Sequence, residues 1–242
     1  MKFLSRAVKV IKRTKSVKSI RFEKPEHFSY LPGQWTFLIF GDGPERIMKP
    51  LSFSSSPTED HLEVTKKLTG LRFSELIDDL EVGDTLSLDG PYGSFSFLGE
   101  HDKVCMLSGG IGITPLRSMI KFCTDKKTST DISLLYSNRN EDEIPFYDDL
   151  MPMQRANPRL VVNMTITNPS PAWRGLSGRL NGEMIKSTVP QWAERIYYVS
   201  GPQPMVESMT ALLTEIGLDP SQIKHEYFSG YNRSNAGEEL VG

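Results

Sequence analysis

The chain has 242 residues, of which 38% are hydrophobic, and its 28 Lys and Arg residues nearly balance 30 Asp and Glu residues. This length predicts two domains, and the balanced charge argues against a nucleic-acid partner, because a phosphate backbone is usually met by a basic face. Two cysteines, Cys105 and Cys123, are too few for a disulfide framework or an iron–sulfur cluster held by four thiolates. We find no apolar stretch with the length of a signal peptide or a membrane span. These features predict a cytoplasmic protein without membrane insertion, with both cysteines in its core.

The first part of the sequence is typical of β structure. Short segments rich in β-branched and aromatic residues cover residues 7–12, 17–23, 36–40, 61–67 and 85–88, and Gly and Pro turns separate them. One helix is expected over residues 74–80, with Ser74 as its N-cap. The basic run at residues 12–18 is expected to be a solvated strand edge. Many short strands with such turns predict an antiparallel β-barrel of Greek-key type over residues 1–98.

The second part alternates buried strands with helices. Unbroken apolar runs at residues 104–107, 132–136, 160–166 and 196–199 are typical of parallel strands. One helix is expected from Pro115, and another carries Met205 and Met209 and ends at Gly217. This alternation predicts a doubly wound α/β domain over residues 102–231, and the polar tail at 232–242 is expected to be flexible.

A glycine-rich stretch at residues 108–115 has the context of a dinucleotide site. It follows an apolar strand and opens a helix, where glycines allow close approach of a pyrophosphate and the helix N-terminus offers unpaired N–H groups. Thr114 is expected to cap this helix and Pro115 to occupy its first position. A simple tight turn is the alternative, and Ser200-Gly201-Pro202 repeats the same arrangement after a later strand.

Seven motifs in order give the sequence its resemblance to the ferredoxin–NADP reductase family, from about Val8 to Tyr231. They are Pro32-Gly33-Gln34, Lys49 to Ser55, Gly70 to Ser74, Gly90-Pro91-Tyr92-Gly93 with Phe95 closing the barrel, Gly109 to Pro115, Gly201-Pro202, and Glu226-Tyr227-Phe228. The resemblance implies a barrel that holds FAD, followed by an α/β domain that holds NADH or NADPH.

The resemblance also implies roles for individual residues. Ser52 would face the reactive ring of the flavin, Ser200 would stand beside the nicotinamide where the family often has cysteine, and Glu226 would handle a proton. An exposed strand position is the equal alternative for Glu226. The residues matched to cofactor binding are Lys49, Pro50, Leu51, Ser52, Phe53, Ser54, Thr65, Lys66, Gly70, Arg72, Phe73, Ser74, Gly109, Gly110, Gly112, Ile113, Thr114, Pro115, Arg139, Gly201, Pro202, Met205 and Phe228.

Several positions depart from the family pattern. Lys49 replaces an arginine that grips the FAD pyrophosphate, and so keeps the charge but loses the bidentate fork. Leu51 replaces a flavin-stacking tyrosine. Arg139 could pair a 2′-phosphate, whereas Thr167-Asn168 stands where NADPH-preferring members commonly have Ser-Arg, which favours NADH or use of both nucleotides.

The expected function is therefore hydride transfer from nicotinamide to FAD and onward transfer of electrons to a separate protein: a ferredoxin, flavodoxin, oxygenase or haem protein. A basic rim of Lys12, Arg13, Lys15 and Lys18 could meet an acidic carrier. A free-flavin reductase and a non-catalytic electron-transfer subunit are the alternatives. The four histidines show no metal-ligand spacing, so no metal is expected.

Overall fold

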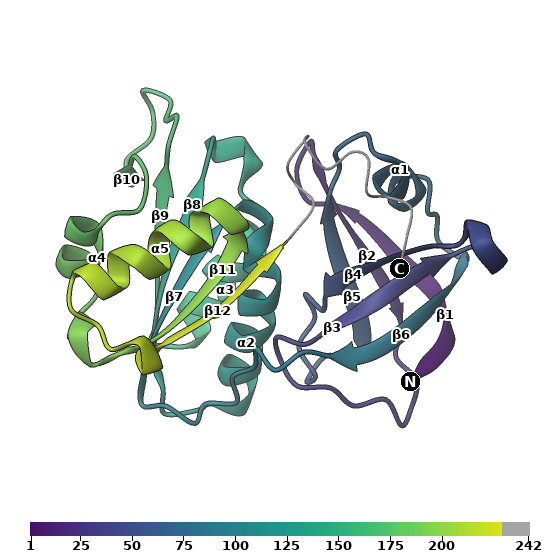
Figure 1. Ribbon diagram of the computed structural model, residues 1–242, viewed down its shortest axis with the longest axis horizontal. Coiled ribbons are helices and arrows are strands. Elements are labelled where there is room, and N and C mark those ends of the chain that lie inside the picture. The colour runs from purple at the N-terminus through teal and green to yellow at the C-terminus, as the bar shows by residue number, and fades with distance from the viewer. Residues whose placement is uncertain (229–242) are drawn as a thin grey trace.

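A computed structural model describes residues 1–228 as two six-stranded sheets that lie side by side (Figure 1). The first sheet and its helices comprise β1 (Lys2–Lys12), β2 (Val17–Glu23), β3 (Trp35–Phe40), η1 (Gly43–Glu45), β4 (Ile47–Ser52), β5 (His61–Lys67), α1 (Arg72–Asp78) and β6 (Thr85–Tyr92). The second part comprises β7 (Lys103–Gly109), η2 (Gly110–Gly112), α2 (Ile113–Lys126), β8 (Asp131–Asn138), η3 (Glu141–Glu143), α3 (Tyr147–Ala156), β9 (Leu160–Ile166), β10 (Leu176–Ser177), α4 (Gly182–Thr188), η4 (Trp192–Glu194), β11 (Ile196–Pro202), α5 (Gln203–Glu215), η5 (Pro220–Gln222) and β12 (Ile223–Phe228). The predicted tail at 232–242 and the end of the predicted second domain lie outside the described residues.

The first sheet is antiparallel, with strand order β4-β3-β6-β1-β2-β5. Its two edge strands meet just after β4, where Phe53 forms a bridge with Val64 and the Ser54 N–H donates to the Glu63 carbonyl at 2.8 Å. Alternate residues of the strands, such as Ile20 and Phe22 in β2, are buried in one core. Closure leaves few unpaired edges, and the predicted antiparallel barrel is confirmed.

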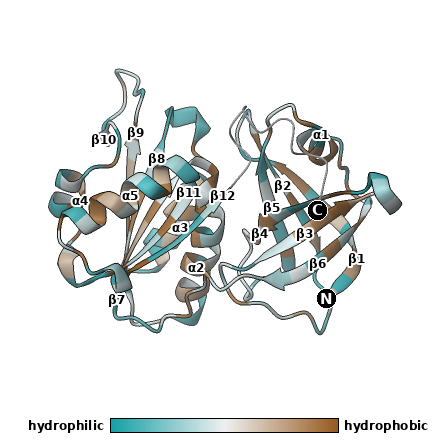
Figure 2. Cartoon of the chain, in the orientation of Figure 1, coloured by the Kyte–Doolittle hydropathy of each residue, from teal (hydrophilic) through white to brown (hydrophobic). Residues whose placement is uncertain are grey.

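The second sheet is parallel throughout, with strand order β10-β9-β8-β7-β11-β12. Successive residues of β7 point to opposite faces of the sheet: Met106 packs with α2 and α3, and Leu107 packs with α4 and α5. Figure 2 shows hydrophobic residues concentrated on these central strands, as expected for a sheet covered on both sides. The predicted doubly wound domain is confirmed. Both cysteines are free and buried, as predicted.

The two expected helix starts, at residues 74 and 115, are each wrong by two residues. Helix α1 begins at Arg72 with Leu71 as N-cap, and the Ser74 hydroxyl inside it accepts a hydrogen bond from the Thr69 N–H at 2.8 Å. Helix α2 begins at Ile113, so Pro115 is third rather than first, a position where its missing N–H still costs no intrahelical bond. Thr114 is not the cap.

The basic run at 12–18 is only partly the expected solvated edge: Lys12 and Lys15 are exposed, whereas Arg13 and Lys18 turn inward. Arg13 is buried between Glu63 of the barrel and Asp149 of α3. Lys18 donates to the carbonyls of Asp78 and Leu80. Arg13 and Lys18 are therefore paired within the chain, through contacts that the sequence pattern does not reveal.

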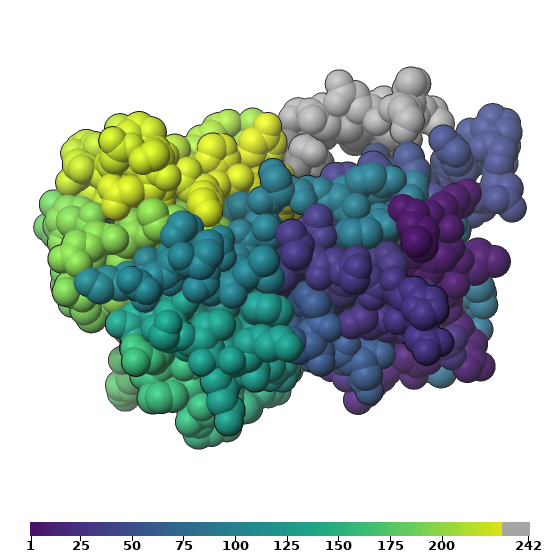
Figure 3. All heavy atoms as spheres, turned by 90° about the horizontal axis from the view of Figure 1, so that it is seen from below, coloured from purple at the N-terminus to yellow at the C-terminus, as the bar shows by residue number. Residues whose placement is uncertain are grey.

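The two domains pack directly against each other, as the space-filling view shows (Figure 3). Phe95 does not close the barrel: its ring lies 5.6 Å from that of Tyr198, in the core of the second domain. Gly33, with φ of 102°, explains part of the closeness, because a Cβ there would lie 2.3 Å from the Phe95 oxygen and 2.4 Å from the Met119 side chain. Within residues 1–228, no helix is both long and apolar enough to cross a bilayer.

Candidate active site

A row of polar side chains crosses three neighbouring strands at the carboxyl edge of the second sheet. In register, Ser108 of β7 lies opposite Ser200 of β11, and Ser200 lies opposite Glu226 of β12. Three of their atoms (the Oγ of Ser108, the Oγ of Ser200 and the Oε2 of Glu226) are buried without a hydrogen-bond partner. Buried polar atoms are normally paired, so this row points to a ligand that supplies the missing partners.

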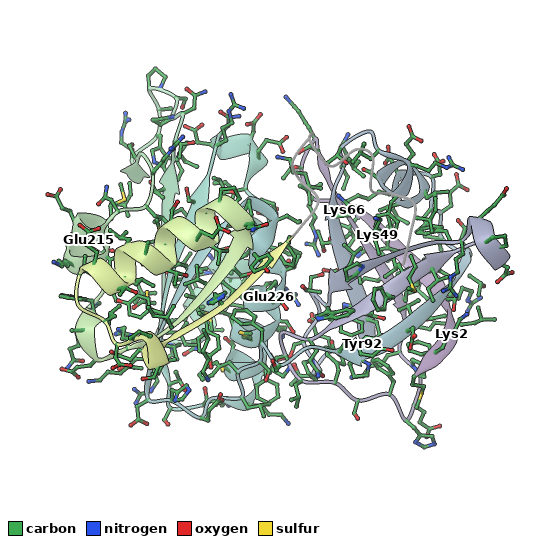
Figure 4. The ribbon with its side chains drawn as sticks, viewed as in Figure 1. Lys2, Lys49, Lys66, Tyr92, Glu215 and Glu226 are labelled. Carbon is green, nitrogen blue, oxygen red and sulfur yellow. The ribbon has the colours of Figure 1, made fainter. Side chains whose placement is uncertain are left out.

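The row lies on the face of the sheet that α2 covers. Met106 and Tyr198, two residues before Ser108 and Ser200, pack into the core that α2 completes. Side chains two residues apart in a strand share a face, so the two serines point to this side as well. Figure 4 shows Glu226 on β12 at the side of the second domain that faces the barrel, where Lys49 and Lys66 are labelled.

Burial makes the Glu226 carboxyl keep its proton to a higher pH than an exposed glutamate does. Burial alone raises the pKa of its carboxyl to about 7, and no cation compensates. A carboxyl poised near neutral pH can hold or release a proton in the working range of an enzyme. Of the alternatives considered for this residue, an exposed strand position does not agree with its partial burial.

The barrel contributes a third unpartnered hydroxyl. Ser52 ends β4, is 4% exposed, and its Oγ has no hydrogen-bond partner. The neighbouring residues of the motif differ from it: Lys49 and Leu51 are partly buried and Pro50 is exposed. Among the described residues, Lys49 makes no hydrogen bond or ion pair, so its ammonium is available for a phosphate.

Other residues matched to cofactor binding turn out to build the barrel core. Phe53 is fully buried, with its ring 4.5 Å from that of Tyr30. The hydroxyls of Ser54 and Thr65 hydrogen-bond each other at 2.8 Å. Phe73 packs against Phe40. These side chains support the site from behind.

The two glycine turns of the second domain touch each other. A Cβ on Gly112 would lie 2.3 Å from the Ser200 carbonyl oxygen, and a Cβ on Gly109 would lie 2.3 Å from the sulfur of Met205. Gly110 has a φ of 53° and open space around its missing Cβ. The backbone there is accessible for a phosphate, whereas Gly112 is required by packing within the chain. Gly201 lies in the same contact, and Pro202 caps α5.

The expected flavin pyrophosphate turn and the expected adenosine contact are both at the surface. Gly70 and Arg72 are exposed, and no side chain would meet a Cβ on Gly70. Arg139 is exposed at the end of β8, and its carbonyl accepts from the Asn168 N–H at 2.9 Å. The structure thus brings Arg139 together with Thr167-Asn168. Ile113 is buried at the start of α2, and Phe228 is partly buried at the end of β12.

The residues present fit two dinucleotide cofactors, with polar groups for their rings and accessible backbone for their phosphates. Unpartnered hydroxyls occur on both sides of the seam, at Ser52 and at Ser200, and accessible glycine backbone occurs at Gly70 and Gly110. Ser108 begins the glycine-rich stretch singled out from the sequence, but the sequence analysis assigned it no role of its own. Within residues 1–228, no group of His, Cys, Asp and Glu is arranged to hold a metal ion.

Comparisons with known proteins agree with this geometry. A family model described as an oxidoreductase FAD-binding domain matches residues 5–97, and one described as an oxidoreductase NAD-binding domain matches residues 106–211. The chain is similar to a glycine betaine monooxygenase reductase subunit of Chromohalobacter salexigens, with 32% identity over 92% of this chain and 63% of that protein. It is similarly related to the subunit of the same description from Pseudomonas aeruginosa, with 33% identity over 93% of this chain and 64% of that protein.

The two-domain fold is also found in solved structures. A ferredoxin NADP+ reductase from Neisseria gonorrhoeae superimposes with a TM-score of 0.81 at 22% identity, covering 93% of this chain and 98% of that one. Barrel, wound sheet and site together define a two-domain flavin and nicotinamide oxidoreductase architecture. The chain belongs to the ferredoxin–NADP reductase-like family. It spans less than two thirds of the length of the curated relatives named above.

Proposed function

We propose that this protein is an FAD-dependent NAD(P)H reductase that takes a hydride from reduced nicotinamide and passes electrons to a separate protein. The observation that carries the proposal is the row Ser108–Ser200–Glu226, whose unpartnered atoms share the α2 face of the sheet. Bound FAD would supply the chemistry, because a flavin accepts a hydride and can release electrons singly or in pairs. The chain's own residues position the two rings and manage protons.

Each polar side chain has a defined task in this proposal. The Ser52 hydroxyl can both donate and accept, so it can serve oxidised and reduced flavin alike. The Ser200 hydroxyl orients the nicotinamide, and Glu226 keeps a proton at its carboxyl up to about pH 7. Lys49 neutralises phosphate, with Arg72 at the neighbouring turn. Because Ser52 and Ser200 are buried, bound cofactor rings at these hydroxyls would be shielded from water.

The nucleotide preference is proposed from the end of the second sheet. Arg139 is the exposed cation there, and its neighbours Thr167 and Asn168 carry no charge. A single exposed arginine gives modest selectivity for a 2′-phosphate, so we propose use of NADH, with NADPH accepted less well.

The acceptor is proposed to be a separate protein. Two curated relatives are named reductase subunits of glycine betaine monooxygenase, which makes an oxygenase component our first choice among the four classes of acceptor. Since the chain covers only part of those relatives, the acceptor is a matter for direct assay with candidate oxygenase components.

The decisive experiment is anaerobic reduction of the purified protein loaded with FAD. We expect stoichiometric FAD, and rapid bleaching of its visible absorbance by NADH. A protein that cannot be loaded with FAD, or whose bound FAD neither NADH nor NADPH reduces, contradicts the proposal. Comparing NADH with NADPH in the same stopped-flow assay tests the proposed preference.

A further inference from the structure

A single buried arginine joins the two halves of the site. Arg117 lies in the second turn of α2, the helix that the glycine loop opens, and its side chain is 3% exposed. Its Nη1 donates to the Ser54 carbonyl oxygen at 3.0 Å and to the Glu59 carboxylate, and its Nη2 donates to Glu59 Oε1 at 3.1 Å. Ser54 stands two residues after Ser52. The arginine therefore ties the start of the nucleotide-binding helix to the flavin-facing segment.

The next residue of the helix makes a parallel contact. Ser118 Oγ donates to the Ser55 carbonyl oxygen at 2.5 Å, and Ser118, Ser54 and Ser55 are all fully buried. Consecutive side chains of α2 thus hold consecutive backbone carbonyls of the barrel. Hydrogen bonds to main-chain carbonyls constrain the position of the barrel backbone directly, without an intervening side chain.

A second layer of charges surrounds this contact. Fully buried Glu63 accepts from Arg13 Nη2 at 2.9 Å and from Arg21 Nε at 2.8 Å. Arg13 also donates to Asp149 of α3 at 2.9 Å. Burial opposes ionisation of Glu63, but the facing arginines outweigh it and lower the pKa of its carboxyl. The carboxylate stays charged, and the barrel and the second domain share one network.

The same holds for the carboxylate that faces Arg117. Burial raises the pKa of Glu59, but its hydrogen bonds and ion pair with Arg117 prevail, so the net pKa is lowered. Burial of the arginine is likewise offset by Glu59, and the pKa of Arg117 is raised. A guanidinium gives two parallel donors in a fixed plane, which a lysine cannot reproduce.

We propose that Arg117 is a positioning residue that sets the separation between the flavin-facing segment and the nucleotide-binding loop. The inference rests on the function proposed above. Hydride transfer needs the reacting atoms about 3 to 3.5 Å apart, and a misplacement of about 1 Å can slow it about a hundredfold. The guanidinium reaches both halves of the site through Ser54 and through α2. Its loss should change how the cofactors approach each other, and leave each one's own binding intact.

The test compares Arg117→Lys and Glu59→Gln with Lys121→Gln. The control removes Lys121, which pairs with Asp125 one turn further along the same helix. Among the described residues, Lys121 itself makes no bond to the barrel, and the substitution keeps the hydrogen bond that Asp125 accepts from Thr58 Oγ1 of the barrel at 2.5 Å. Each variant is loaded with FAD and titrated with NAD+, and its flavin is then reduced anaerobically by NADH in stopped flow. Long-wavelength charge-transfer absorbance between nicotinamide and flavin reports directly on ring stacking. Limited proteolysis of the flavin-free variants reports on domain coupling without any cofactor.

We expect Arg117→Lys to slow flavin reduction at saturating NADH at least about tenfold and to weaken the charge-transfer band. FAD content and the dissociation constant for NAD+ should stay within about twofold of the parent protein, and flavin-free Arg117→Lys should be cleaved faster between the domains. Glu59→Gln should shift all readings the same way, and Lys121→Gln should match the parent.

Two results would overturn the inference. One is an unchanged reduction rate and charge-transfer band in both Arg117→Lys and Glu59→Gln. The other is loss of FAD binding in proportion to the loss of rate, which would make Arg117 a residue of the fold alone. If the parent protein itself is not reduced by either nucleotide, the proposed function fails. In that case the proteolysis of the flavin-free variants still tests whether Arg117 couples the two domains, and a cleavage rate equal to that of the parent refutes this.

Discussion

The raised pKa of Glu226 makes a measurable prediction about stability. Moving a carboxyl pKa from 4.5 to about 7 means that the folded protein binds a proton more tightly than the unfolded chain does. Stability from this group is fully present below pH 4.5 and falls as the pH rises towards 7, where the folded carboxyl ionises. At about 1.36 kcal/mol per pKa unit, the loss across this window is roughly 3 kcal/mol. Above it, the loss is constant.

Replacement of Glu226 by Gln removes this dependence while keeping the side chain's shape. Urea unfolding of the parent and of Glu226→Gln, measured between about pH 5 and about pH 8, should show the variant gaining up to about 3 kcal/mol on the parent as the pH rises. Glu215→Gln is the matched control, because Glu215 is exposed at the end of α5 and loses the same charge in solvent. Parallel curves for Glu226→Gln and its parent would refute the argument that burial governs this carboxyl.

Three further predictions follow from the packing. Ser52→Ala should leave the stability of the flavin-free protein unchanged, because the lost hydroxyl has no partner, yet slow flavin reduction about tenfold; Ser54→Ala, whose hydroxyl is hydrogen-bonded, should instead lower the urea midpoint. Gly112→Ala should destabilise by about 1 to 3 kcal/mol in thermal unfolding, because its Cβ would lie 2.3 Å from the rigid carbonyl of Ser200. Neither cysteine should react with a thiol reagent until the protein is unfolded, since burial raises the pKa of Cys105 to about 12 and shields both thiols.

Periodicity was enough to predict both halves of the fold. The strands β2, β5 and β9 have the predicted bounds. Each strand buries most of its apolar residues in the core of its own domain, so the apolar pattern marks where the strand begins and ends. Helix starts were less accurate, since Ser74 and Thr114 are residue types that often cap helices but lie within the first turn here, where their hydroxyls bond the backbone of residues before the helix. A residue caps a helix only when its backbone has the right geometry, and the residue type alone does not determine that geometry.

Motifs in the sequence singled out Ser52, Ser200 and Glu226 near the carboxyl ends of strands, and the structure shows a buried polar atom without a partner at each; their roles stay predictions. What the sequence could not reveal is which polar residues would pair internally. Thr65 and Ser54 look like ligands in a list of motifs, yet they satisfy each other inside the barrel. Register across strands decides this, and register joins residues far apart in the chain, such as Ser108 and Ser200.

Paired charges hold part of the seam between the domains, where apolar side chains could give the same or greater stability. Replacing buried ion pairs by hydrophobic residues often costs nothing in stability, so stability does not explain Arg117, Glu59 and Glu63. Apolar surfaces, however, tolerate sliding, whereas a guanidinium fork bonded to a carboxylate and a backbone carbonyl permits one geometry. The unpartnered atoms at Ser52 and Ser200 need such a fixed separation if two stacked rings are to lie between them. Hydride transfer requires a fixed distance between the two rings, and a directional network of charges at the seam is suited to hold such a distance.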